Sequence, residues 1–340
     1  MSVPPRPAAV ALTLALAAVL AACSGGKPAA TPSPSPTLAT PSHTPTPTPT
    51  PGRTGSLLSG RDTPDGRTLA VKIENTGAAR PQSGLKAADV VYDEEVEGGL
   101  NRLMAVYSTD LPASVGPVRS ARISDLELLA QYGRVAYAYS GAQTRMYPYI
   151  NRANLLDVGA ERSGVGYYRT SRPSPHNLYA HPRQLLARAP GATRTRDVGF
   201  RFGSAPAGGK PATSVTVRWL TSSTAFTWSA SSKRWLISFD GSPAYAAEGG
   251  RLTTPTAIVQ YAKVTDSGFG DKFGGRTPLI TTVGRGTALV LRDGAAYPVS
   301  WSRPTPASPT TWTYRGAPML LAPGQVWVVL QSTTRPAAVR

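Results

Sequence analysis

A run of Thr-Pro and Ser-Pro repeats from Pro28 to Pro51 divides the 340-residue chain into an apolar leader and a long remainder. Proline fixes φ and lacks a backbone N–H, and this run carries almost no large apolar side chain that could join a core. Repeated proline favours an extended polyproline II tether that rises about 3.1 Å per residue. A folded core must therefore be built from residue 56 onwards.

The segment before the repeats has the pattern of a bacterial lipoprotein signal peptide. Arg6 precedes an uncharged run from Ala8 to Leu20, which is shorter than the roughly 20 residues of a membrane-spanning helix. The run ends in Leu20-Ala21-Ala22-Cys23, which is similar to a lipobox, and Cys23 is the only cysteine. We expect residues 1–22 to be a signal peptide, Cys23 to carry palmitate-type acyl chains, and residues 23–55 to be the tether. This places the protein at the cell membrane, lipid-anchored on the extracytoplasmic side.

Charge and composition divide the remainder into two parts. The whole chain has 36 Lys plus Arg against 19 Asp plus Glu, a formal net charge of +17. Most of this excess and all six Trp lie beyond residue 189, and a stretch rich in Gly, Pro, Ala and Arg separates the two parts. We predict one domain at 56–195 and a second at 205–335. The lone cysteine excludes an intrachain disulfide and a cysteine-ligated zinc site.

Hydrophobic periodicity predicts an α+β fold class. In the first domain the pattern indicates a mixed α/β structure, with strands at 69–73, 88–97, 102–108 and 135–140 and helices at 123–132, 142–151 and 182–189. Ser124 and Glu127 fit a capping box at the start of the first helix. In the second domain short apolar runs between turn signals such as Asp240-Gly241 predict a mostly antiparallel β structure. Most of its Trp side chains are expected in the core.

Several segments together resemble the YerB-like bacterial lipoprotein family. They include Ile73 to Asn75, Ala79 to Leu85, Gly116 to Arg122 and His176 to Tyr179, in the order and spacing of that family. The resemblance extends from about Thr68 to Leu330. It implies a lipid anchor, an N-terminal domain bearing these motifs and a β-rich C-terminal domain, and it implies no established enzymatic activity.

An acidic strand precedes Gly98-Gly99, which is a strong hairpin signal. Side chains alternate along a strand, so Asp93, Glu95 and Glu97 are expected on one face, with Arg102 opposite Glu95 or Glu97. Three interpretations stay open: a solvated strand face with its counter-ion, a site for a cation or a sugar, and a carboxylate pair for acid/base hydrolysis of the cell wall.

The Gly116 to Arg122 segment runs directly into the first predicted helix. Arg119 and Arg122 would therefore flank backbone amides at the positive end of the helix, with Ser120 between them. Such a place binds carboxylate or phosphate, and the alternative is an internal ion-pair network. His176 and Asn177 are expected in a loop that closes this site. His176 and His181 do not have the spacing of a metal site, and Ser120 with His176 could act as nucleophile and base only if the fold brings them together.

We therefore expect a non-catalytic binding module of the cell envelope, with Arg119, Ser120, Arg122, Glu95, Glu97, Arg102, His176 and Asn177 as ligand-binding residues. The expected ligand is an anionic cell-wall polymer or a partner protein. One alternative is a wall hydrolase that uses Glu95 and Glu97, and another is a scaffold for an envelope complex. No metal, no cofactor and no nucleic-acid partner is expected, and the sequence leaves the oligomeric state open.

Overall fold

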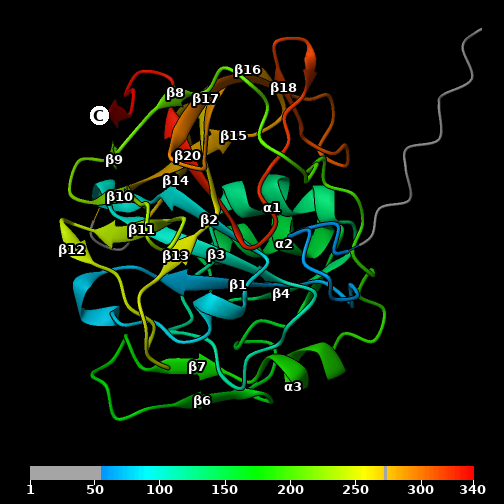
Figure 1. Cartoon of the computed structure of the whole chain (residues 1–340). Helices are drawn as coiled ribbons and strands as arrows, with labels where there is room; N and C mark the ends of the chain where they lie inside the picture. Colours follow the sequence, from blue (N-terminus) through cyan, green and yellow to red (C-terminus); the bar gives the residue numbers. More distant parts are fainter. Residues whose placement is uncertain (1–54, 272–273) are drawn as a thin grey trace, which may run out of the picture. The chain divides into compact units, whose positions relative to one another are not determined.

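The computed structural model describes residues 55–271 and 274–340, which fold around one long mixed sheet (Figure 1). The predicted signal peptide, the Cys23 lipidation site and most of the tether lie outside these residues. The N-terminal segment supplies β1 (Leu69–Glu74), β2 (Val90–Glu95), β3 (Asn101–Tyr107), β4 (Val135–Ala138), β5 (Leu155–Asp157), β6 (Tyr167–Arg169), β7 (Leu178–Ala180), α1 (Ile123–Leu129), α2 (Tyr147–Arg152) and α3 (Pro182–Ala187).

The C-terminal segment is built from strands. They are β8 (Lys210–Pro211), β9 (Ser214–Arg218), β10 (Ser223–Ser229), β11 (Arg234–Phe239), β12 (Ser242–Pro243), β13 (Thr253–Thr254), β14 (Thr256–Gly270), β15 (Arg276–Thr281), β16 (Gly284–Arg292), β17 (Ala295–Arg303), β18 (Thr311–Tyr314), β19 (Ala317–Pro318), β20 (Val326–Ser332) and β21 (Ala338–Val339). The described chain is thus mostly β, with few and short helices, which refines the predicted α+β class. None of the helices in residues 55–271 and 274–340 has the length and apolar character to cross a membrane.

Strand β20 joins the two segments within the long sheet. The order of that sheet is β19-β18-β17-β16-β14-β20-β2-β3-β1-β4-β5, and β20 pairs in parallel with β14 on one side and with β2 on the other. The described residues of both segments therefore form a single compact unit rather than two separate bodies. The C-terminal pairings are otherwise mostly antiparallel, as predicted, and β9 to β13 with β21 form a second sheet.

The two faces of the long sheet carry separate cores. One face packs against the second sheet through buried residues such as Val71, Leu103, Trp235 and Trp327. The other face packs against α1 through residues such as Tyr92, Met104 and Leu128. Five of the six Trp are buried, and Trp228 is half-buried. The Trp side chains therefore serve mainly as core residues.

The predicted elements lie close to the observed ones, but the cap of α1 differs. Arg122 is the N-cap residue, and its backbone N–H donates to Asp125 Oδ2 at 2.6 Å. Ser124 and Glu127 instead bond the C-terminal segment: Ser124 Oγ accepts from Ile280 N at 2.9 Å, and Glu127 Oε1 accepts from Thr282 N at 2.7 Å. The predicted capping box is wrong because both side chains are used in tertiary contacts.

Candidate functional site

The β2–β3 hairpin has a different register from the one that the sequence suggested. Glu94 lies opposite Arg102 and Glu95 lies opposite Asn101, so the connection from Val96 to Leu100 has an odd number of residues. A short 3₁₀ helix, η3 (Glu97–Gly99), forms this connection. The expectation of Arg102 opposite Glu95 or Glu97 is therefore wrong, because an odd loop moves every β3 side chain to the other face.

The three carboxylates that were expected in a row have separate partners. Asp93 is buried and accepts hydrogen bonds from Asn101 Nδ2 at 2.7 Å and Thr224 Oγ1 at 2.6 Å. Burial raises the pKa of Asp93 to about 7, against the lowering effect of these bonds. Glu95 pairs with Arg335 at 3.1 Å. Glu95 and Glu97 therefore do not face each other as a catalytic pair.

Glu97 lies beyond the end of β2 and pairs with Arg122. Its Oε2 lies 2.5 Å from Arg122 Nη2, and its Oε1 accepts a hydrogen bond from the Thr277 hydroxyl. Burial alone raises the pKa of Glu97, but the hydrogen bond and charge of Arg122 outweigh it and lower the pKa below its usual value. Glu97 is thus held as a carboxylate.

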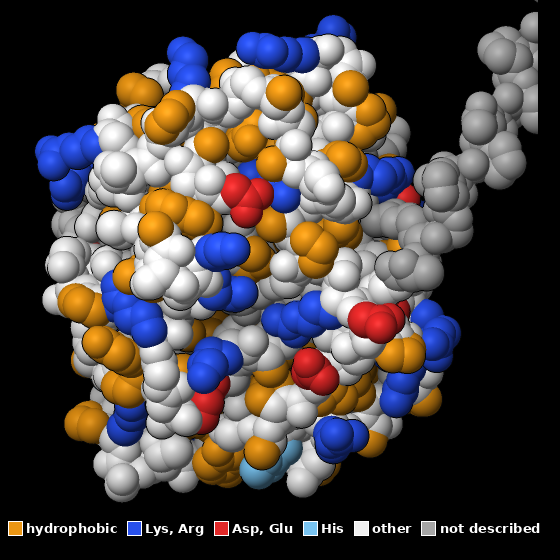
Figure 2. All heavy atoms as spheres, viewed as in Figure 1, with side chains coloured by type: hydrophobic (Ala, Val, Ile, Leu, Met, Phe, Trp, Pro, Cys, Tyr) orange, Lys and Arg blue, Asp and Glu red, His pale blue; other side chains and the backbone are white. Residues whose placement is uncertain are grey.

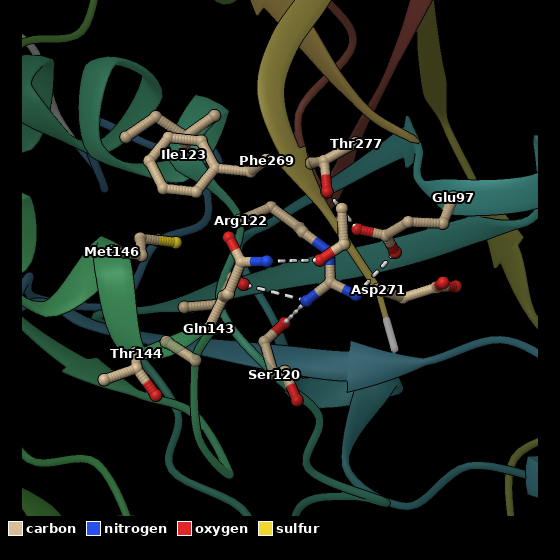
Figure 3. A pocket seen from close by; sticks show the side chains of 13 residues that line it. Glu97, Ser120, Arg122, Ile123, Gln143, Thr144, Met146, Phe269, Asp271 and Thr277 are labelled. Carbon is tan, nitrogen blue, oxygen red and sulfur yellow. Dashed lines mark hydrogen bonds and ion pairs between the residues drawn. The ribbon is translucent and has the colours of Figure 1, made fainter. Parts of the chain in front are cut away.

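A pocket of about 450 Å³ opens beside this ion pair (Figure 3). Arg122 lies at its centre, with Glu97 and Thr277 on one side and the apolar side chains of Ile123, Met146 and Phe269 on the other. Its wall is completed by Ser120, Ala121, Ala142, Gln143, Thr144, Gly270 and Asp271. The hairpin of β14 and β15 thus closes over the start of α1, and the pocket combines both segments of the chain.

Two buried polar atoms of the pocket side chains have no hydrogen-bond partner in the part of the chain that the structure describes. They are Arg122 Nε, a donor, and Gln143 Oε1, an acceptor. The remaining Arg122 nitrogens are engaged, with Nη1 donating to Ala121 O at 2.9 Å. Buried polar groups are usually paired, so these two atoms mark a place where a polar partner fits.

Arg119 and His176 meet at a second carboxylate, that of Glu74. Glu74 is buried, with Oε2 at 2.9 Å from His176 Nδ1 and Oε1 at 3.4 Å from Arg119 Nε. Asn177 instead accepts from Arg169 Nη1 at 2.6 Å. His176 Nδ1 is engaged by Glu74, and no hydrogen bond joins Ser120 to His176 among the described residues. The structure therefore brings Arg119 and His176 together, and separates them from Glu95.

An ion-pair network lies beneath the pocket. Lys72 is fully buried, pairs with Glu94 and lies 2.7 Å from Asp125 Oδ1. Burial lowers the pKa of Lys72 to about 8 in spite of these carboxylates. Arg102 donates to Ser120 O at 3.2 Å, and burial together with the charges of Arg122 and Arg119 lowers its pKa to about 9. Most of these arginines therefore take part in an internal ion-pair network, which was one of the two interpretations of the sequence.

Several residues of this region were not predicted from the sequence. Lys72 and Glu74 could have been found, because each is a charged residue within the otherwise apolar run from Leu69 to Ile73 and its end. Gln143, Asp271 and Thr277 carry no comparable signal, since they meet only through the long-range packing of the β14–β15 hairpin, in which Gly270 O accepts from Gln143 Nε2 at 2.8 Å. Within residues 55–271 and 274–340, no cluster of His, Cys, Asp and Glu is arranged to hold a metal ion.

Charge on the molecular surface is dispersed. Figure 2 shows Lys and Arg side chains spread over the visible face, with apolar, uncharged and a few acidic side chains between them. The net charge of +17 therefore does not form a single basic patch on this face.

Comparison with known proteins identifies both segments. Residues 53–196 match the family described as "Protein of unknown function (DUF3048) N-terminal domain", and residues 215–328 match its C-terminal domain. "Putative lipoprotein YerB" of Bacillus subtilis (strain 168) is 48% identical over 115 residues, which cover 33% of this chain and 34% of that relative. The aligned region thus spans about a third of the relative's length. The crystal structure of YerB protein from Bacillus subtilis has the same fold, with a TM-score of 0.71, 21% identity and coverage of 84% of this chain and 99% of that chain. The chain therefore belongs to the two-domain, YerB-like DUF3048 family.

Proposed function

We propose that the protein is an extracytoplasmic envelope lipoprotein whose pocket at Arg122 binds an acidic saccharide of the cell wall without catalysis. The lipid anchor is supported by the leader, by Cys23 and by the name of the Bacillus subtilis relative. The binding role is carried by the pocket, and above all by the unpartnered Arg122 Nε and Gln143 Oε1 beside it.

The lining of the pocket fits a sugar ring with a negative group. Arg122 is the one cationic side chain among the described residues that line it, and a guanidinium suits a carboxylate or phosphate oxygen. Glu97, Asp271 and Gln143 supply oxygens that can accept from ligand hydroxyls. Phe269 and Met146 supply an apolar side for the ring faces. A neutral apolar ligand would leave Arg122 Nε and Gln143 Oε1 without partners.

Hydrolysis fits the pocket less well than binding. A glycosidase needs one carboxyl group that stays protonated to act as general acid. The lowered pKa of Glu97 keeps that group ionised, and Glu95 points to Arg335 instead of the pocket. Glu97 is therefore assigned to ligand orientation through Arg122.

Binding of the full-length protein to purified cell wall and to soluble muropeptides tests this proposal. Arg122→Gln should weaken binding at least tenfold, because it removes the guanidinium at the centre of the pocket. Gln143→Ala should weaken it by a smaller factor. Arg218→Gln is the matched control, because Arg218 is exposed on β9 and does not line the pocket.

Arg119→Ala tests whether binding depends on the pocket or on the neighbouring cluster around Glu74. Arg119 does not line the pocket, so this variant should bind nearly as well as the parent protein. Equal binding by Arg122→Gln and the parent would refute the proposed site. Release of soluble sugars from wall, lost in Glu97→Gln, would show a hydrolase instead.

A further inference from the structure

A small closed cavity lies between α1 and the C-terminal sheet, away from the Arg122 pocket. Its volume is about 10 Å³, which is the room of one water-sized species. Its lining residues come from both family segments and from the link between them, residues 197–214. They are Tyr92, Leu128, Gln131, Val198, Phe200, Gln260, Thr282, Arg303, Thr310 and Trp312.

Three of the lining side chains have buried N–H groups without a partner. They are Arg303 Nε, Gln260 Nε2 and Trp312 Nε1. The exposed fractions of these residues are 0% for Arg303, 3% for Gln260 and 5% for Trp312. All three atoms are donors and together they carry four hydrogens. A water molecule accepts about two hydrogen bonds and must place two hydrogens of its own, so this donor set exceeds what one water can satisfy.

Arg303 also carries a buried positive charge without an ion pair among the described residues. Its terminal nitrogens donate to Thr282 Oγ1 at 2.8 Å, Glu127 O at 2.6 Å and Pro306 O at 2.5 Å, all of which are uncharged oxygens. The Thr282 hydroxyl in turn donates to Glu127 Oε1 at 3.1 Å, so the Glu127 carboxylate acts on Arg303 through a bridging hydroxyl and also accepts from the amides of Thr282 and Val283. A buried charge that makes no direct ion pair is incompletely compensated, so a small anion would be favoured beside it.

The hydroxyl groups of the cavity do not supply the missing acceptor. Tyr92 Oη is bonded to Tyr132 Oη at 2.7 Å and accepts from Gln131 Nε2 at 3.3 Å. Thr310 Oγ1 donates to Gln131 Oε1 at 3.1 Å. These side chains satisfy one another, so the hydroxyl groups of Tyr92 and Thr310 are not partners of the three N–H donors of the lining side chains.

We propose that this cavity binds a single chloride ion, which joins the N-terminal segment, the link and the C-terminal segment. The guanidinium, amide and indole N–H groups of Arg303, Gln260 and Trp312 would form its ligands. A monatomic anion accepts all of them and compensates the charge of Arg303. Larger anions such as phosphate and sulfate are excluded by the size of the cavity.

Crystals of the protein grown in sodium bromide test the site directly. An anomalous bromide peak should lie within hydrogen-bonding distance of Arg303 Nε, Gln260 Nε2 and Trp312 Nε1. An ordered water at this position without an anomalous peak would overturn the proposal.

Thermal unfolding in chloride and in gluconate at equal ionic strength is the second measurement. Above saturation, each tenfold rise in chloride should raise the Tm by about 3 °C, while gluconate should not. Trp312→Phe should reduce this dependence, because it removes one donor and keeps the aromatic packing.

Trp301→Phe is the matched control for that variant. Trp301 pairs with Trp312 across β17 and β18, but its Nε1 already donates to Tyr261 O at 3.1 Å. The control should lose stability and keep the full chloride dependence. Identical Tm values of the parent protein in chloride and gluconate would contradict a chloride site.

Discussion

At the scale of single residues, the buried charges matter more than the exposed ones. Asp93, Lys72 and Glu74 are each almost fully buried, and each meets polar or charged partners from another part of the chain. Their types were evident in the sequence, but their partners were not. Thr224 reaches Asp93 across 131 positions, a separation at which hydrophobic periodicity carries no information.

Asp93→Asn should change the dependence of stability on pH. The folded-state pKa of Asp93 is raised to about 7 from an unfolded value of 3.8, so between these values the folded state holds a proton that the unfolded state lacks. The parent protein therefore loses stability through this group as the pH rises from about 4 to 7. Asparagine carries no charge, so the stability of the variant relative to the parent should increase from pH 5 to pH 8, by on the order of a few kcal/mol.

Urea unfolding of both proteins at pH 5, 6, 7 and 8 measures this difference. Asp110→Asn serves as the control, because Asp110 is exposed, lies 3.6 Å from Arg61 and is not among the charges that act on Asp93. A difference between Asp93→Asn and the parent that stays constant with pH would show that Asp93 is ionised in the folded state.

Lys72→Met should destabilise the protein by about 3–5 kcal/mol, because it leaves Glu94 and Asp125 buried without their shared cation. Adding Glu94→Gln and Asp125→Asn should recover part of this loss, since the uncompensated charges are then removed. Equilibrium urea unfolding of the single and triple variants gives both values. Equal stability of Lys72→Met and the parent would argue against a paired charge at this position.

At the scale of elements, the η3 turn determines which face of β3 each side chain occupies. Gly98-Gly99 indicates a turn, but the expected pairing of Arg102 with Glu95 or Glu97 needs an even number of loop residues, and the observed connection has an odd number. The actual connection is fixed by tertiary contacts: Gly98 O accepts from Thr221 Oγ1 at 2.7 Å, and Gly99 O accepts from Ser222 Oγ at 2.9 Å. Whether the β2–β3 connection has an odd or an even number of residues therefore depends on its contacts with the loop at Thr221 and Ser222. The sequence near Gly98 and Gly99 carries no information about these contacts.

Alanine substitutions at the two glycines should differ in their effect. Both have a φ of +68°, so either substitution places an L-residue in the left-handed region, at about 1–2 kcal/mol. A Cβ at Gly98 meets nothing within 4 Å, whereas one at Gly99 would lie 2.4 Å from Leu220 Cβ and 2.8 Å from Leu220 N. Gly99→Ala should therefore lower the Tm clearly more than Gly98→Ala.

Thermal unfolding of both variants measures the comparison, and muropeptide binding adds a second readout. Displacement of η3 in Gly99→Ala should also weaken binding, because Glu97 begins this turn and lines the pocket. Equal Tm values for the two variants would show that the contact with Leu220 yields without cost.

At the scale of the whole molecule, the two family segments form one folding unit. The change in composition near residues 189–210 overlaps the gap between the two matched family segments, which cover residues 53–196 and 215–328. Composition did not show that they share a sheet. The run from Val326 to Leu330 did indicate a central strand, because a continuous apolar run is typical of a parallel strand buried on both faces. Its partners, β2 and β14, could not be read from the sequence.

Expression of residues 55–205 and 205–340 as separate chains should give poorly folded products. The first would expose the edge of β2, and the second would expose the edge of β20. The intact protein should unfold in one transition, with Trp fluorescence of the C-terminal segment and amide exchange in β1 and β3 giving the same urea midpoint. Two separate midpoints would show that the segments fold independently.

The central place of β20 has a consequence for biosynthesis. Ribosomes make a chain from its N-terminus, and residues 326–332 are made after every other strand of the long sheet. The sheet therefore cannot close before β20 has been made, and until then the nascent polypeptide lacks its middle strand. Premature termination before Val326 would leave two exposed edges, which makes truncated products natural targets for proteolysis.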